Sequence, residues 1–184
     1  MLEYNKISEN SRCRCSMLDF YYRMIDDESF CITKCVGTGD TAIIPTNIKV
    51  TVLFDDLFKE RKDLVKVVIP DTVTQIGGFV FDGCVNLKEV ILPPKLKDMW
   101  QYAMTRCGIE RIEIPGTVES IIPFTFFKCE NLKEVVLNEG TKRIYAWAFK
   151  DCTALRDVYL PASIEIISDK AFEGCNNIIL HEAK

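Results

Sequence analysis

The chain has 184 residues, of which 48% are hydrophobic and 27% charged, so it can bury the core of one domain and does not have the composition of a disordered protein. It carries 23 basic and 27 acidic residues, and the net charge of -4 argues against a nucleic-acid-binding protein and against a polybasic membrane anchor. Its single histidine, His181, makes most catalytic triads and zinc enzymes hard to build.

The N-terminal segment Met1–Lys6 has no basic stretch followed by an apolar run, so no signal peptide is visible. No later segment approaches the roughly 20 apolar residues that cross a bilayer. We therefore expect a cytoplasmic protein without membrane insertion, with the cell surface as the alternative location.

Residues 1–29 are predicted to form an N-terminal helical cap. Ser16 and Asp19 fit an S-x-x-D box, which is typical of a helix start. The apolar residues around them recur at helical spacing: Leu18, Tyr21, Tyr22 and Ile25. Such a helix covers the open strand edge of the first turn of the repeats that follow, or binds a partner.

Residues 30–63 are predicted to form an irregular first repeat. Phe30–Lys34 favours an opening strand, and Gly37–Asp40 favours a turn. A weak copy of the later repeat follows, with Ile44-Pro45, Leu53 and Leu57-Phe58 in place if about two residues are inserted before Leu53.

Residues 64–184 contain five repeats and end in a short strand near Ile178–His181. The repeat cysteines are separated by 23, 22, 23 and 23 residues, and they are Cys84, Cys107, Cys129, Cys152 and Cys175. The units share the pattern Leu/Ile-x-x-Val/Ile-x-Ile/Leu-Pro, then spaced aliphatics, then an Ala-Phe-like pair and Cys, except that Asn138 replaces the proline and Thr141 an aliphatic residue in the fourth unit. The units begin at Leu64, Leu87, Ile109, Leu132 and Leu155, the third of them one residue early. A repeat of this length predicts a solenoid.

These units resemble the BspA-like type of leucine-rich repeat over residues 30 to 180, because both the proline-ended strand and the A-F-x-x-C turn recur. The resemblance implies an α/β leucine-rich-repeat solenoid of about six stacked turns, with a parallel β-sheet and short helical or 3-10 turns. It also implies a role in protein or surface recognition, since members of the family are often adhesins or cell-surface proteins.

The strand tract of each unit alternates with period two, so its first and third residues point inward and the middle one outward. The predicted partner-binding residues are this outward column: Val68, Ile91, Glu113, Val136 and Tyr159. An uncovered apolar row on a sheet is a candidate contact surface. The structural alternative is a preference for β-forming residues on an open sheet.

Aromatic residues form a second candidate surface just before the Ala-Phe pair of each unit. This alternative binding ridge consists of Phe79, Trp100, Tyr102, Phe124, Tyr145 and Trp147. Aromatic side chains are favoured anchors at interfaces. The structural alternative is that they pack between turns and fill an edge of the solenoid.

The repeat cysteines are predicted to be reduced and structural, because side chains that point in parallel are poorly placed for disulfides. Cys13, Cys15, Cys31 and Cys35 lie outside the repeat, and their spacing matches no strong zinc template, so neither a metal nor a cofactor is predicted. No phosphate loop, nucleophile elbow or His-Glu-x-x-His motif occurs, and no catalytic residue is assigned. An acid/base pair of carboxylates is the alternative.

Two functional hypotheses follow. In the first, the chain is a non-enzymatic scaffold that binds a protein partner through its exposed sheet face. In the second, it is a surface adhesin that recognises a host glycan or matrix protein through the aromatic ridge. Self-association through the C-terminal strand edge is a further expectation, because an uncovered edge invites pairing.

Overall fold

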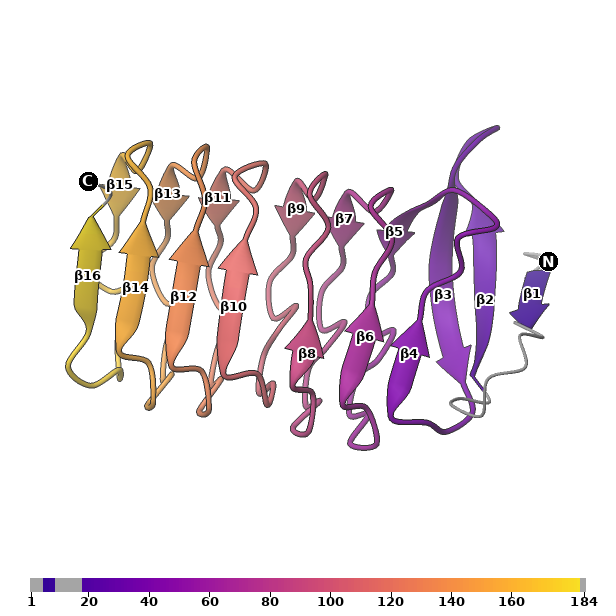
Figure 1. The fold of residues 1–184 in the computed structure, drawn as a ribbon, viewed down its shortest axis with the longest axis horizontal. Coiled ribbons are helices and arrows are strands. Elements are labelled where there is room, and N and C mark those ends of the chain that lie inside the picture. Colours follow the sequence, from indigo (N-terminus) through magenta and orange to yellow (C-terminus); the bar gives the residue numbers. More distant parts are fainter. Residues whose placement is uncertain (1–4, 9–17, 183–184) are drawn as a thin grey trace.

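The computed structural model describes residues 5–8 and 18–182, and they form a parallel β-solenoid of about seven turns (Figure 1). The regular elements of the described residues are strands. They are β1 (Asn5–Ser8), β2 (Asp19–Met24), β3 (Phe30–Val36), β4 (Thr41–Ile43), β5 (Val50–Leu53), β6 (Lys66–Val68), β7 (Gln75–Ile76), β8 (Glu89–Val90), β9 (Asp98–Met99), β10 (Arg111–Ile114), β11 (Ser120–Ile121), β12 (Glu134–Leu137), β13 (Arg143–Ile144), β14 (Asp157–Leu160), β15 (Ile166–Ile167) and β16 (Ile179–Glu182).

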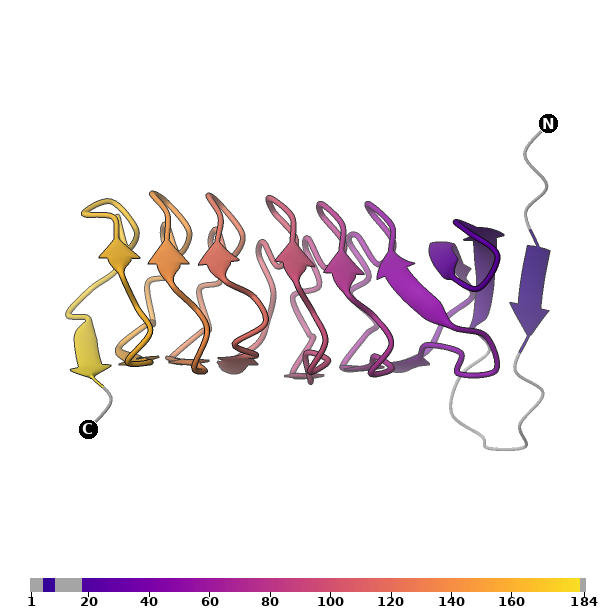
Figure 2. The same ribbon diagram turned by 90° about the horizontal axis from the view of Figure 1, so that it is seen from above.

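Each repeat contributes one strand to each of two faces. The long-strand face carries the sheets β4-β6-β8 and β10-β12-β14-β16, and the short-strand face carries β3-β5-β7-β9 and β11-β13-β15. The two faces lie on different sides of the stack, as the views in Figures 1 and 2 show. Pairing within the sheets of the repeats is parallel, and it is in register from β5 onward on the short-strand face and throughout the long-strand face, so that Arg111 lies opposite Glu134 and Glu134 opposite Asp157. Equivalent residues of successive repeats therefore form columns.

The interior is one continuous apolar core. Inward residues of the strands, such as Val67, Ile112 and Val158, are almost completely buried, and they alternate with exposed neighbours. The phenylalanines before the cysteines stack in the core on either side of Met104, with ring centroids 5.0 Å apart for Phe126 and Phe149. This arrangement confirms the predicted solenoid, because a single unit could not bury these side chains alone.

The repeat cysteines form the predicted column, and each thiol bonds to the turn before it. Cys84 Sγ donates to the Phe58 carbonyl oxygen at 3.0 Å, and Cys107 Sγ donates to that of Phe81 at 3.0 Å. All cysteines within the described residues are free thiols. Burial raises the pKa of the Cys84 thiol to about 12 and raises that of Cys107 well above its usual value.

We expect the protein to lose stability in alkaline solution because of this column. An unfolded cysteine ionises near pH 8.5, whereas the folded thiols keep their protons. As the pH rises above about 8.5, the unfolded chain releases protons that the folded chain retains, so the free energy of unfolding falls by about 2 kcal/mol per buried thiol near pH 10. Urea denaturation at neutral and alkaline pH, in the presence of a reductant, measures this fall.

The matched variants are Cys84→Ala and Val80→Ala, which each truncate a fully buried side chain in the same turn. Cys84→Ala should weaken the pH dependence, and Val80→Ala should lower stability equally at both pH values. Identical pH dependence in the wild type and Cys84→Ala would contradict the assignment.

The predicted helical cap is wrong. Asp19–Met24 is strand β2, which pairs with β3 in an antiparallel hairpin, and β3 continues in parallel to β5. Leu18 and Phe20 are buried with strand alternation, and the Phe-Tyr-Tyr run favours a strand over a helix. The hairpin turns at Asp26, whose carboxylate accepts hydrogen bonds from the Ser29 backbone N–H at 2.8 Å and its hydroxyl at 2.7 Å. Ser16, the expected start of the helix, lies outside the described residues.

The predicted helical or 3-10 turns are also wrong for the described residues. Alternate backbone N–H groups in these turns donate to the next repeat, such as Phe81 to Ala103 (2.8 Å), while those between them donate within the turn, such as Asp82 to Phe79 (3.1 Å). In a helix every such group would donate within its own segment. With no helix among the described residues, none of them forms a helical membrane span.

The opening strand and turn predicted at 30–40 are confirmed, since β3 ends at Val36 and β4 begins at Thr41.

One seam interrupts the solenoid between the repeats of β8–β9 and β10–β11. In the described residues no strand pairing joins β8 to β10 or β9 to β11, and both faces divide there (Figure 1). The seam follows the shortened link Cys107-Gly108-Ile109, where the other units have two residues after the cysteine. A Cβ on Gly108 would lie 2.0 Å from the Val85 carbonyl oxygen, so only glycine fits this link.

Candidate binding surfaces

The predicted partner-binding residues lie together on the long-strand face. Val68, Ile91 and Tyr159 are exposed large hydrophobic side chains, and Val136 is half-buried between the Glu113 and Tyr159 rungs. Ile91 is the most exposed, at 73%, because β8 ends just before it and the seam leaves its outer side without a paired strand. The five residues lie on the same face in two groups, Val68 and Ile91 on one side of the seam and Glu113, Val136 and Tyr159 on the other, and we call them together the apolar row.

The apolar row is longer than the sequence prediction. Ile43 pairs with Val68 at one end, and His181 pairs with Tyr159 at the other. The His181 ring stacks on Tyr159 at 4.4 Å, and its Nε2 lies 2.8 Å from Asp157 Oδ1. Both residues could have been found by extending the strand alignment one unit in each direction.

Charged residues beside the row neutralise one another. Lys66 Nζ lies 2.5 Å from Glu89 Oε1, and Arg111 Nε lies 2.7 Å from Glu134 Oε1. Glu113, the one charged member of the row, accepts a hydrogen bond from Asn138 Nδ2 at 3.1 Å. An apolar centre with a polar rim is the usual anatomy of a protein interface.

The six residues of the predicted aromatic ridge divide into two groups. Four of them stack on each other across successive turns, half-buried, and this aromatic stack consists of Phe79, Tyr102, Phe124 and Trp147. Their centroid separations are 4.8, 5.2 and 5.4 Å, so packing between turns accounts for them. Trp100 and Tyr145 instead remain exposed, at 55% and 42%.

The backbone of the aromatic stack is left-handed at every member, with φ between 57° and 63°. A left-handed conformation costs a side-chain-bearing residue about 1–2 kcal/mol. Stacking contributes about 0.5–1.5 kcal/mol per pair and offsets part of that cost. Lys59 Nζ lies 4.6 Å from the Phe79 ring centroid at one end, and Trp147 Nε1 donates to Glu173 at 3.1 Å at the other.

The exposed aromatics border a groove of about 1040 Å³, which we call the aromatic groove. Five successive turns contribute to its lining, so it runs along the solenoid. The lining residues are Asp55, Gly78, Phe79, Trp100, Gln101, Tyr102, Ile122, Pro123 and Tyr145. Asp55 and Gln101 were not part of the predicted ridge, because their outward orientation depends on turns whose shape the sequence pattern does not specify.

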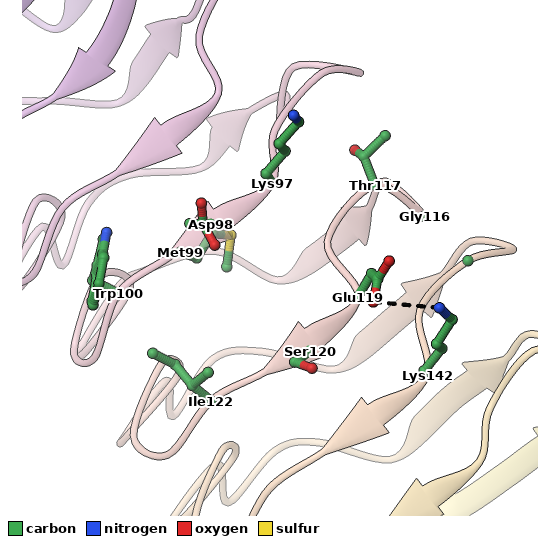
Figure 3. A pocket seen from close by; sticks show the side chains of 11 residues that line it. Lys97, Asp98, Met99, Trp100, Gly116, Thr117, Glu119, Ser120, Ile122 and Lys142 are labelled. Atoms are coloured by element: carbon green, nitrogen blue, oxygen red, sulfur yellow. Dashed lines mark ion pairs between the residues drawn. The ribbon is translucent and has the colours of Figure 1, made fainter.

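A second hollow of about 680 Å³ lies at the seam and shares Trp100 and Ile122 with the groove (Figure 3). Asp98 and Lys97 border it from the β9 side, and Glu119 pairs with Lys142 at 3.3 Å from the other side. Two basic and two acidic side chains border this hollow, so their charges balance.

No group of metal-ligating side chains occurs within the described residues. Cys31 and Cys35 both lie on β3, and burial raises the pKa of each thiol. Cys35 Sγ accepts from Arg61 Nη1 at 3.6 Å. Cys13 and Cys15 lie outside the described residues.

The C-terminal end carries exposed hydrophobic side chains on its last strands. Ile166 on β15 and Ile179 and Leu180 on β16 are exposed, and β16 is the final strand of its sheet. Self-association through this edge stays a prediction.

Comparison with known proteins agrees with this geometry. Residues 51–179 match the family model for the BspA type leucine rich repeat region, in six copies. The chain belongs to the BspA-type leucine-rich repeat family. No curated protein matches it.

Solved structures of bacterial leucine-rich repeat proteins share the fold. The leucine-rich repeat protein of T. pallidum is 31% identical, with a TM-score of 0.82 over 89% of this chain and 78% of that one. A leucine-rich repeat protein from Bacteroides ovatus is 23% identical, with a TM-score of 0.67 over 87% of this chain and 51% of that one. A leucine rich cell surface protein from Faecalibacterium prausnitzii is 24% identical, with a TM-score of 0.67 over 89% and 49%. The chain spans about half the length of the last two.

Proposed function

We propose that this BspA-type repeat chain is a non-enzymatic scaffold that holds a protein partner on its long-strand face. The observation that carries the proposal is the apolar row, in which Ile91 is a large aliphatic residue directly after β8 and is 73% exposed. Ion pairs beside the row neutralise the charged side chains at its rim. A partner that covers the row would remove this surface from water, which is favourable by about 25 cal/mol per Å² of apolar area.

The test is an affinity capture with an Ile91→Asp/Val136→Asp double variant. Two desolvated carboxylates at the centre of the contact should remove the bound partner. The control is Thr153→Asp/Ala154→Asp, which makes the same charge change at exposed positions in a turn. Proteins retained by the control and lost by the double variant support the proposal, and equal capture by both variants contradicts it.

A second candidate is adhesin-type recognition of a glycan or matrix protein through the aromatic ridge. The aromatic groove and its two exposed walls, Trp100 and Tyr145, favour it. This function requires a location at the cell surface, whereas the first also suits the cytoplasm. Trp100→Ala/Tyr145→Ala should remove binding in the second case and leave it intact in the first.

A further inference from the structure

We propose that the aromatic groove binds a proline-rich peptide in the polyproline II conformation. The inference concerns a surface separate from the apolar row, and it names one class of ligand for the aromatic groove. It depends on three properties of the groove: its direction and length, the spacing of its exposed aromatic walls, and the hydrogen-bonding character of its lining.

The groove is long enough to hold an extended peptide. Its lining runs from Asp55 to Tyr145 through five successive turns, so four steps of roughly 5 Å give it a length of about 20 Å. Six or seven residues of polyproline II, at about 3.1 Å each, cover that length. The groove is lined by side chains of the turns and not by a strand edge, so an added β-strand has no ladder to join there.

The aromatic walls repeat at the pitch of the proposed ligand. Trp100 and Tyr145 occupy equivalent positions two turns apart, with Ile122 between them. Two turns of the solenoid advance about 9.6 Å, and one turn of polyproline II advances about 9.3 Å. The register holds across the seam, since the Tyr102–Phe124 separation of 5.2 Å falls between those of the neighbouring pairs.

The exposed walls of the groove carry two hydrogen-bond donors that suit the carbonyl acceptors of a proline-rich ligand. Asp55 Oδ1 is already used, because it accepts the Gly78 N–H at 2.8 Å. In the described part of the chain, Trp100 Nε1 and Tyr145 Oη have no hydrogen-bond partner, and both groups can donate. Proline residues offer a carbonyl acceptor and no N–H, so a proline-rich segment matches these free donors.

Decaproline is the probe, and the fluorescence of Trp100 is the readout. The chain has two tryptophans, so the Trp147→Phe background leaves Trp100 as the sole reporter and keeps an aromatic ring in the stack. A saturable blue shift is expected on titration with decaproline. A Gly-Ser peptide of equal length should produce no saturable shift.

Two tyrosine variants in this background separate the groove from the rest of the surface. Tyr145→Ala should weaken decaproline binding at least tenfold, because it removes one wall. Tyr159→Ala truncates a tyrosine of nearly equal exposure, 40% against 42%, on the long-strand face, and affinity should not change. Equal affinities of the two variants would overturn the proposal, as would saturation by the Gly-Ser peptide.

A glycan site is the alternative outcome. Saturation of the Trp100 signal by chitohexaose, without saturation by decaproline, would overturn the peptide proposal and assign the groove to sugars. The Ile91→Asp/Val136→Asp variant should bind decaproline normally. Failure of the long-strand proposal is therefore distinguishable from failure of this one.

Discussion

Replacing Phe126 with alanine is expected to lower the free energy of unfolding by about 3–5 kcal/mol. The Phe126 side chain has no exposed surface, and its ring stacks on that of Phe149 in the next turn. Its carbonyl oxygen also accepts the Cys152 thiol at 3.0 Å. The truncation leaves a cavity at the contact between two turns, where a solenoid has no other element to fill it.

Phe127 provides the matched control, because it is the adjacent phenylalanine and points to the surface. It is half-buried, and its ring meets that of Phe124 edge to face at 5.8 Å. Phe127→Ala should cost no more than about 1.5 kcal/mol, the contribution of one aromatic pair. Thermal unfolding followed by circular dichroism should place the melting temperature of Phe126→Ala about 6–20 °C below the wild type. Similar losses for the two variants would contradict the assignment of Phe126 to the core.

The repeat architecture was predictable because its signal is redundant. Val67, Ile112 and Val158 occupy the same position in three units, and an inward orientation for one requires it for all. The cysteine column followed from the same alignment. Periodicity of this kind reports burial directly, since each unit must bury the same face against its neighbours.

The N-terminal cap was not predictable in the same way, because it occurs once. Leu18, Tyr21 and Tyr22 fit a helical stripe, yet Leu18 and Phe20 also fit strand alternation. Pairing with β3 decides between them, and that pairing is a tertiary interaction which no local pattern encodes.

For the binding surfaces, the sequence predicted which residues share a column but not the shape of the surface that they form. Alignment identified Trp100 and Tyr102 as neighbouring aromatic positions, but it could not indicate that one is exposed and the other stacked. The left-handed backbone at Tyr102, with φ of 63°, directs its ring along the solenoid. The seam had a visible signal in the 22-residue spacing of Cys107 and Cys129, but its effect on strand pairing depends on the three-dimensional link at Gly108.

Removal of Arg106 should destabilise the protein more than removal of its partner Asp82. Arg106 Nε and Nη2 donate to the two carboxylate oxygens of Asp82, each at 2.8 Å, and Nη2 also donates to Glu60 at 2.7 Å. The Asp82 side chain is 5% exposed, whereas that of Arg106 is 46% exposed. The pair is therefore asymmetric: the carboxylate is buried and the guanidinium reaches water.

The asymmetry determines the cost of each truncation. In Arg106→Ala a buried carboxylate loses its counter-charge, and we expect a loss of about 3–5 kcal/mol in the free energy of unfolding. In Asp82→Ala the guanidinium remains solvated and bonded to Glu60, so the loss should be about 1–3 kcal/mol. Alanine is used at this position and not glycine, because φ at Arg106 is 53° and glycine would also relieve backbone strain there.

The double variant Asp82→Ala/Arg106→Ala tests the physical cause. If an unpaired buried carboxylate is the cost in Arg106→Ala, then removing Asp82 as well removes that cost, and the double variant should be more stable than Arg106→Ala alone. Urea denaturation of the three variants and of Glu60→Ala, which truncates the exposed partner of Arg106, completes the comparison. Strictly additive losses in the double variant would mean that the turn depends on the packing of these side chains and not on neutralisation of Asp82.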